Sequence, residues 1–461
     1  MSELISLEEA LSVSREELKR KHREYVNPAF QKMLGYLGFD KKFVQAKDTK
    51  VWDASGETYI DFLGGYGSLN LGHNPEEVYR AIDQVRSMPN ILQSSLGILN
   101  ASLAENLALL TPGKLRHSFF CNSGAESVEA AIKLARKVTG KSDIISAKGS
   151  FHGKTMGALS VSGREKYKQG FEPLLDGCKQ VSFGDLEQLE RALNHQVAAV
   201  LLEPIQGEGG VIIPPEGYLS KARELCDRYK ALLIIDEIQT GLGRTGKIFA
   251  SQWEDVTPDI LCLAKSLGGG VMPIGAMVTT SEHWQKAYGS MDSALLHTST
   301  FGGNTVASAA AIQALNSLVE NELAEAAKEQ GTYLLDGLAS LAGKHSLIKE
   351  VRGKGLLVGI EFHLPEKDVL NKISKGMVSQ MGREYTGAFV AERLLNEYQV
   401  ITAYTLNNPN VIRLEPPLTI TREELDYALN CIEDLVKKYQ NFYRLAFSSG
   451  KKAVRSFFNS D

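Results

Sequence analysis

The chain has 461 residues, of which 51 are Lys or Arg and 55 are Asp or Glu, for a net charge of −4. This length suffices for two or three domains with a large buried core, and 43% hydrophobic residues is an ordinary globular value. The near-neutral balance excludes a strongly basic nucleic-acid binder and a strongly acidic disordered chain. We therefore expect no nucleic-acid partner.

The sequence also gives no sign of a membrane segment, a disulfide framework or a metal site. No apolar run reaches the roughly 18 residues of a membrane helix, and the acidic, helical start does not resemble a signal peptide. The five cysteines are far apart, without a C-x-x-C pair, and the nine histidines form no H-x-x-x-H pair. We expect a soluble, cytoplasmic protein with no membrane partner and no structural metal.

Short apolar runs alternate with amphipathic stretches through the middle of the chain. The strand-like runs are 117–122, 197–205, 231–238 and 259–265, and the helical patterns are 126–138 and 217–230. Apolar runs without polar alternation are typical of strands buried on both faces. Strands that alternate with helices predict an α/β fold with a parallel sheet.

The last hundred residues have a different pattern. Residues 350–362 and 410–420 are strand-like, and 421–440 have the apolar spacing of a helix. They predict a smaller α+β domain that the N-terminal segment joins. We expect residues 1–75 and 346–461 to form this small domain and 76–345 to form the large one. The aromatic, mildly basic tail after residue 440 is either a helix packed on the protein or a contact for a membrane or partner.

The stretch IIDEIQTGLGRTGK, residues 234–247, contains two overlapping glycine patterns. The dinucleotide fingerprint needs its first glycine directly after the strand, whereas DEIQT separates the apolar run from Gly241. The phosphate-loop pattern needs Ser or Thr after its lysine, and this chain has Ile248. Both nucleotide interpretations fail, and the glycines are best explained as a turn.

Three features at strand ends remain. Asp236 ends a buried run, where it is either a cap, a paired structural acid or a partner for a ligand cation. Lys265 ends the next run, as a snorkelling lysine or a reactive amine of lowered pKa. Residues 123–125 open the helix after the first run, where free backbone N–H groups bind phosphate. Together these three features match what pyridoxal phosphate (PLP) requires.

At this point the sequence resembles the class III aminotransferases, PLP enzymes of fold type I. The motifs FFCNSGAESVEAAIKLAR, LLEPIQGEGGV, LLIIDEIQTGLGRTGK, PDILCLAKSLGGGVMPIGA, HTSTFGGN and IRLEPPLT carry the resemblance, which extends from about residue 51 to 419. It implies a large domain with a mostly parallel seven-stranded sheet plus the smaller α+β domain. Within the family, the resemblance is to the diamine (putrescine) aminotransferases, with ornithine and acetylornithine aminotransferases as the nearest relatives.

The resemblance implies a role for each matched residue. Lys265 binds the coenzyme covalently and then moves the proton, while Asp236 keeps the pyridine nitrogen protonated. The remaining cofactor contacts are Gln239 at the phenolic oxygen, Phe151 or His152 stacked on the ring, and the backbone N–H groups of Ser123, Gly124 and Ala125 at the phosphate. Thr300 is expected to reach the phosphate in the other subunit, which implies a homodimer with shared active sites.

Arg413 is expected to bind the carboxylate of the 2-oxo acid through its fork of donors. Glu208 is its expected switchable partner, because an unpaired Arg413 repels a diamine and is costly to bury. The alternative is a static ion pair between domains. Tyr66 either lines the mouth of the pocket or only packs.

Three departures from the ornithine-type pattern bear on the substrate. Lys154 stands where those relatives typically have an arginine for the substrate carboxylate, Lys50 where the ornithine enzyme has a tyrosine, and Ala125 where a threonine is frequent. The first two weaken a site for a donor with its own α-carboxylate. The expected reaction moves a terminal amine from a diamine, putrescine or cadaverine, to 2-oxoglutarate. The alternatives are an ornithine, acetylornithine or 4-aminobutyrate aminotransferase, and a catalytically silent relative.

Overall fold

A seven-stranded sheet forms the centre of the computed structural model, which describes residues 4–92, 94–364, 377–440 and 443–445. Its strand order is β4-β10-β9-β8-β7-β5-β6. Only β10 runs antiparallel to its neighbours β4 and β9, and the other pairs are parallel. The strands are β4 (Leu115–Cys121), β5 (Asp143–Ala147), β6 (Cys178–Val181), β7 (Val197–Leu202), β8 (Leu232–Asp236), β9 (Ile260–Leu263) and β10 (Gly275–Thr280).

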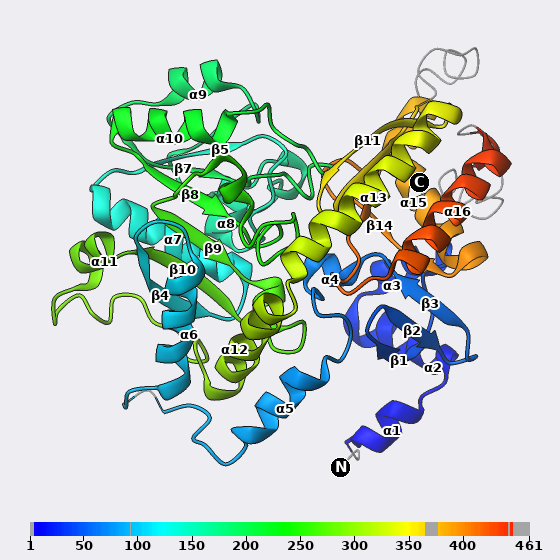
Figure 1. Ribbon diagram of the computed structural model, residues 1–461, viewed down its shortest axis with the longest axis horizontal. Coiled ribbons are helices and arrows are strands. Elements are labelled where there is room, and N and C mark those ends of the chain that lie inside the picture. The colour runs from blue at the N-terminus through cyan, green and yellow to red at the C-terminus, as the bar shows by residue number, and fades with distance from the viewer. Residues whose placement is uncertain (1–3, 93, 365–376, 441–442, 446–461) are drawn as a thin grey trace.

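Helices cover both faces of this sheet (Figure 1). Along β8, Leu233 and Ile235 join one buried cluster and Ile234 joins the other, because successive side chains of a strand point to opposite faces. This explains why the predicted strands read as continuous apolar runs. The covering helices are α6 (Ile98–Leu110), α7 (Gly124–Thr139), α8 (Met156–Val161), α9 (Leu186–Ala192), α10 (Tyr218–Tyr229) and α11 (Ser281–Tyr288), with short 3-10 turns at Glu165–Tyr167, Ala250–Glu254 and Lys265–Gly268.

Two smaller sheets lie beside the large one. The antiparallel sheet β11-β12-β15-β14 packs against long helices, and a mixed sheet β1-β2-β3-β13 brings the N-terminal segment together with a C-terminal strand. The strands are β1 (Phe43–Lys47), β2 (Lys50–Asp53), β3 (Thr58–Asp61), β11 (Ile348–Lys354), β12 (Leu357–Phe362), β13 (Val400–Ile401), β14 (Ala403–Tyr404) and β15 (Val411–Leu414).

The remaining helices connect and flank these sheets. They are α1 (Leu7–Ser12), α2 (Arg15–Lys21), a π-helical turn (His22–Val26), α3 (Pro28–Tyr36), α4 (Gly64–Gly67), α5 (Glu76–Gln84), α12 (Thr305–Glu320), α13 (Leu323–Lys344), α15 (Met377–Tyr398) and α16 (Arg422–Tyr439). Figure 1 shows α12 under the large sheet and α13 running on toward β11. The boundaries 75/76 and 345/346 stay a prediction, and most of the predicted tail lies outside the described residues.

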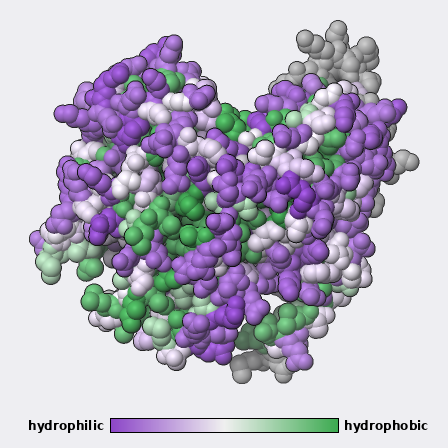
Figure 2. Space-filling view, viewed as in Figure 1, coloured by the Kyte–Doolittle hydropathy of each residue, from purple (hydrophilic) through white to green (hydrophobic). Residues whose placement is uncertain are grey.

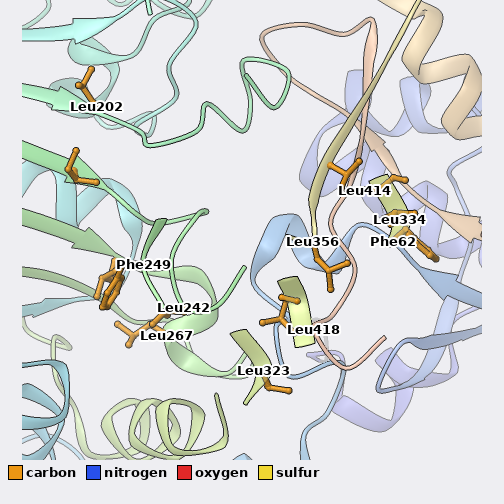
Figure 3. Close-up of a cluster of buried hydrophobic side chains, with 14 of the residues drawn as sticks. Phe62, Leu202, Leu242, Phe249, Leu267, Leu323, Leu334, Leu356, Leu414 and Leu418 are labelled. Atoms are coloured by element: carbon orange, nitrogen blue, oxygen red, sulfur yellow. The ribbon is translucent and has the colours of Figure 1, made fainter. Parts of the chain in front are cut away.

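One hydrophobic cluster extends from the large sheet into the smaller ones. It includes Leu202 of β7, Phe249 and Leu267 on one side and Phe62 and Leu414 on the other (Figure 3). Burial of large apolar side chains is the dominant stabilising term in a fold of this size. The shared core therefore fixes the small sheets against the edge of the large sheet where the strands end.

Candidate active site

A cavity of about 260 Å³ opens at the carboxyl edge of the large sheet. β7, β8 and β9 are parallel, and β4 runs in the same direction, so the carboxyl ends of all four strands lie at this edge. Ligands of open α/β sheets bind beyond this edge. The lining residues are Gly124, Ala125, Phe151, His152, Gly153, Glu203, Glu208, Asp236, Ile238, Gln239, Thr240 and Lys265.

Asp236, the last residue of β8, is held by two hydrogen bonds. Its Oδ1 accepts from the Ile238 N–H at 3.0 Å, and its Oδ2 lies 2.7 Å from His152 Nδ1. Both side chains are buried, and His152 Nε2 has no hydrogen-bond partner among the described residues. The hydrogen bond from His152 thus fixes the orientation of the Asp236 carboxylate. Phe151 and His152 both line the cavity, so the prediction that one of them stacks on a cofactor ring stays a prediction.

Lys265 follows β9 at the same edge. Its backbone φ of 51° lies in the left-handed region, which is strained for a residue with a side chain. Burial lowers the pKa of its ammonium below the usual value, while the Glu415 carboxylate opposes this shift. Within the described part of the chain, no side chain or carbonyl accepts a hydrogen bond from Lys265 Nζ. It is an unengaged amine of increased nucleophilicity.

The first turn of α7 forms the opposite wall of the cavity. The Ser123 side chain caps the helix by accepting from the Glu126 N–H at 3.3 Å. Gly124 and Ala125, which line the cavity, come first in the helix, where N–H groups lack intrahelical acceptors. A Cβ at Gly124 would approach Ile238 Cδ1 to 2.8 Å, so the turn is closely packed. This arrangement suits an anionic group.

Gln239 lies between the cavity and the small sheets. Its Nε2 donates to the Tyr66 carbonyl and to Glu415 Oε2, both at 3.3 Å. A Cβ on Gly207 would lie 1.6 Å from Gln239 Oε1, so any larger residue there requires the amide to move. The amide is therefore held at the cavity wall by contacts on both sides.

Arg413 lies behind Glu208, outside the lining of the cavity. It is fully buried, with Nη1 2.7 Å from Glu208 Oε1 and Nε 2.9 Å from Glu415 Oε2. Burial alone would disfavour the ionised Glu208, but the Arg413 charge and the hydrogen bond from the Leu406 N–H together lower the pKa of this carboxyl. The guanidinium is thus bracketed by two carboxylates, of which Glu208 faces the cavity.

Four residues that the sequence analysis relates to substrate or cofactor binding do not line this cavity. Tyr66 is half exposed and covers the Arg413 guanidinium, with 5.3 Å between the group and the ring centre. Lys154 is placed over the Tyr167 ring, and Lys50 points toward Glu424 at 4.0 Å. Thr300 is exposed and lines a separate cavity of about 410 Å³ formed by residues 88–92, 95–98, 100, 300 and 302–305.

Sequence reasoning missed two acids, Glu203 and Glu415. Burial, followed by the Asp236 carboxylate, raises the pKa of Glu203 well above its usual value. Glu415 is fully buried against Arg413. Both are inside motifs already singled out, LLEPI and IRLEPP. The i, i+2 spacing of Arg413 and Glu415 along a strand was an available signal.

Known proteins match this chain over most of its length. The family model described as "Aminotransferase class-III" matches residues 39–436. The ornithine aminotransferase of Toxoplasma gondii ME49 has 32% identity and a TM-score of 0.81, over 93% of this chain and 96% of that one.

Two further solved structures are similar. An amine transaminase from an uncultivated Pseudomonas species, in a PLP-bound form, has 29% identity and a TM-score of 0.77, over 86% of this chain and 94% of that one. The acetylornithine aminotransferase of Elizabethkingia anophelis has 29% identity and a TM-score of 0.73, over 93% and 100%.

The residues present fit PLP. The cavity presents an unengaged amine from Lys265, a carboxylate on Asp236 and the free N–H groups of Gly124 and Ala125, one for each polar end of the coenzyme. Among the described residues, no group of three or more His, Cys, Asp or Glu side chains is arranged to hold a metal ion. In the same part of the chain, no helix is long and apolar enough to span a bilayer.

Proposed function

Because the chain belongs to the class III aminotransferases, which are PLP-dependent, we propose that it transfers a terminal amino group from a diamine to 2-oxoglutarate. Putrescine is the expected donor, and cadaverine a second one. The products are glutamate and 4-aminobutanal, which closes to 1-pyrroline. The proposal refines the family activity by naming the donor.

One observation supports this choice: among the described residues that line the cavity, no Lys or Arg other than Lys265 is available to bind an α-carboxylate. Among the described lining residues Lys265 is the only Lys or Arg, whereas Glu203, Glu208 and Asp236 are acids. Arg413 is covered by Glu208, and Lys154 and Lys50 point elsewhere. Such a wall favours a cationic donor over a donor that carries its own carboxylate.

In this proposal the chain's own residues hold the coenzyme and move one proton. Lys265 Nζ binds it, Asp236 faces its ring nitrogen, Gln239 its phenolic oxygen, and Gly124 and Ala125 its phosphate. The coenzyme, when bound, supplies an electron sink for the carbon that loses its proton. The Lys265 amine, freed once the donor nitrogen has taken its place on the coenzyme, would accept that proton and return it, a task suited to an amine of lowered pKa.

The same site must then accept a dicarboxylate. We propose that Glu208 neutralises Arg413 while the amine is bound and moves aside for the 2-oxo acid, whose carboxylate takes its place. An Arg fork binds a carboxylate through two parallel hydrogen bonds. Arg413 Nη2, which has no partner among the described residues, provides the second donor.

We further propose a cytoplasmic homodimer with shared active sites. Thr300 is exposed in its own cavity, and Leu92, Leu96, Leu295 and Phe301 nearby are exposed large apolar residues. Figure 2 shows further hydrophobic residues gathered over the region of α6 and β4. Large exposed apolar patches are typical of interfaces. All five cysteines are free, as expected in a reducing compartment.

A panel of donors with 2-oxoglutarate tests the proposal. The purified enzyme should show the highest kcat/KM with putrescine or cadaverine, and 1-pyrroline should accumulate with putrescine. A much higher kcat/KM with ornithine, acetylornithine or 4-aminobutyrate would overturn the diamine assignment. The similarity to ornithine and acetylornithine aminotransferases makes these donors the second candidates.

A further inference from the structure

Glu415 is a fully buried carboxylate next to the substrate region, and none of the expected roles uses it. It directly follows β15, two residues after Arg413, so both side chains point to the same side of the chain. Its Oε2 lies 2.9 Å from Arg413 Nε and accepts from Gln239 Nε2 at 3.3 Å. Its Oε1 has no hydrogen-bond partner among the described residues.

The surrounding backbone is shaped around this side chain. The Glu415 N–H donates to the Phe62 carbonyl at 2.7 Å. Gly64 and Gly67 both have positive φ, and a Cβ on Gly67 would lie 2.5 Å from Glu415 Oε1. Desolvating a carboxylate costs several kcal/mol unless it is paired. A fold that encloses Glu415 this tightly therefore keeps it as the second anion of Arg413.

We propose that Glu415 determines donor specificity by acting through Arg413: with Glu208 it gives the guanidinium two anions, so that the site selects ammonium groups over α-carboxylates. Glu415 is a positioning residue, because Arg413 and Gln239 separate it from the cavity. The inference rests on the proposed function, in that a diamine is the donor such a charge pattern favours.

The sign of the effect follows from one unit of charge. With Glu208 and Glu415 both in place, the two carboxylates balance the buried cations Arg413 and Arg244, so the cluster does not repel a dicationic donor. Loss of Glu415 leaves Arg413 paired with Glu208 alone, so a substrate carboxylate can replace Glu208 on Arg413 more readily. Arg244, whose charge Glu415 also stabilises, is bound to the carbonyls of Leu356 and Pro416, and its positive charge adds to the excess that the loss of Glu415 leaves. A unit charge a few ångströms beyond the cavity changes relative affinities on the order of tenfold.

The test compares the holoenzyme with Glu415→Gln and the charge-keeping Glu415→Asp. The ratio of kcat/KM for putrescine to that for ornithine should fall on the order of tenfold in Glu415→Gln, mostly through KM. Glutarate, a dicarboxylate without a reactive carbonyl, should bind this variant more tightly by a similar factor in calorimetry. Glu415→Asp should keep the wild-type ratio within about threefold.

Glu361→Gln is the matched control, because Glu361 also pairs with a largely buried arginine, Arg352, in the same small sheet. It should change neither the ratio nor glutarate binding. If Glu415→Gln does not fold, Glu415→Ala carries the same charge change and takes its place. An unchanged ratio and unchanged glutarate affinity in the folded variant would overturn the role of Glu415.

These results separate the two proposals. A wild-type enzyme that prefers ornithine would overturn the diamine assignment alone, since the role of Glu415 is judged by the change in ratio relative to wild type. Equal loss of activity with both donors would indicate a purely structural role for Glu415 and would overturn the inference alone.

Discussion

Replacing Glu208 with glutamine tests whether its pair with Arg413 opens during turnover. The substitution keeps the shape of the side chain and its acceptor for the Leu406 N–H, which lies 2.9 Å from Glu208 Oε2. It removes the charge that covers Arg413 from the cavity side. A switch predicts opposite effects on cationic and dicarboxylic substrates, whereas a static pair predicts none that depend on substrate charge.

The strength of the ion pair between Arg413 and Glu208 determines how large this change in substrate preference should be. At the 2.7 Å that separates Arg413 Nη1 from Glu208 Oε1, two unit charges attract by about 6 kcal/mol at an effective dielectric constant of about 20. Desolvation of the buried acid, the largest effect that opposes its ionisation, offsets much of this attraction. About 3 kcal/mol remains, which corresponds to a change of about a hundredfold in relative affinity.

The assay follows the coenzyme absorbance in single half-reactions with putrescine and with glutamate. In Glu208→Gln, kcat/KM for putrescine should fall and that for glutamate should rise, so that their ratio changes by about a hundredfold. Glu208→Asp, which keeps the charge, should stay near the wild type. Equal slowing of both half-reactions in Glu208→Gln would refute the switch and favour the static pair.

Three further predictions concern the walls of the cavity. Gly207→Ala should displace the Gln239 amide, shift the coenzyme absorbance and lower kcat, whereas Gly343→Ala, with nothing within 4 Å of the added Cβ, should change neither. The folded-state pKa of Glu203 is raised, so its stability contribution is present at low pH and is lost as the pH rises above the ordinary glutamate value of 4.5. The melting temperature of Glu203→Gln, relative to that of the wild type, should therefore increase as the pH rises above this value, and a pH-independent difference would contradict this. Since the pKa of Lys265 is lowered, capture of PLP by the apoenzyme should reach its maximal rate at a lower pH than a free lysine, as stopped-flow absorbance can check.

The central strands could be predicted because their local pattern reflects their environment. The apolar runs at 197–205, 231–238 and 259–265 became β7, β8 and β9, since strands buried on both faces tolerate few polar residues. The predicted strand at 410–420 was too long. It ends at Leu414, because Pro416 and Pro417 cannot continue the ladder of hydrogen bonds.

The cavity could be predicted only in part. Asp236 and Lys265 each end a strand, so sheet topology alone brings them to one edge. The pairing of His152 with Asp236 across 84 positions, and of Glu415 with Arg413 and Gln239, depends on packing between sheets that no local pattern records. For the same reason, the placement of Lys154 over Tyr167 could not be foreseen.

The bond between Lys265 and the coenzyme is the central claim, and one experiment tests it directly. Borohydride treatment of the purified holoenzyme, followed by proteolysis and mass spectrometry, should locate a phosphopyridoxyl group on the peptide that contains Lys265, with loss of the yellow colour. The label on another lysine, or a colourless protein that takes up no PLP, would contradict the account.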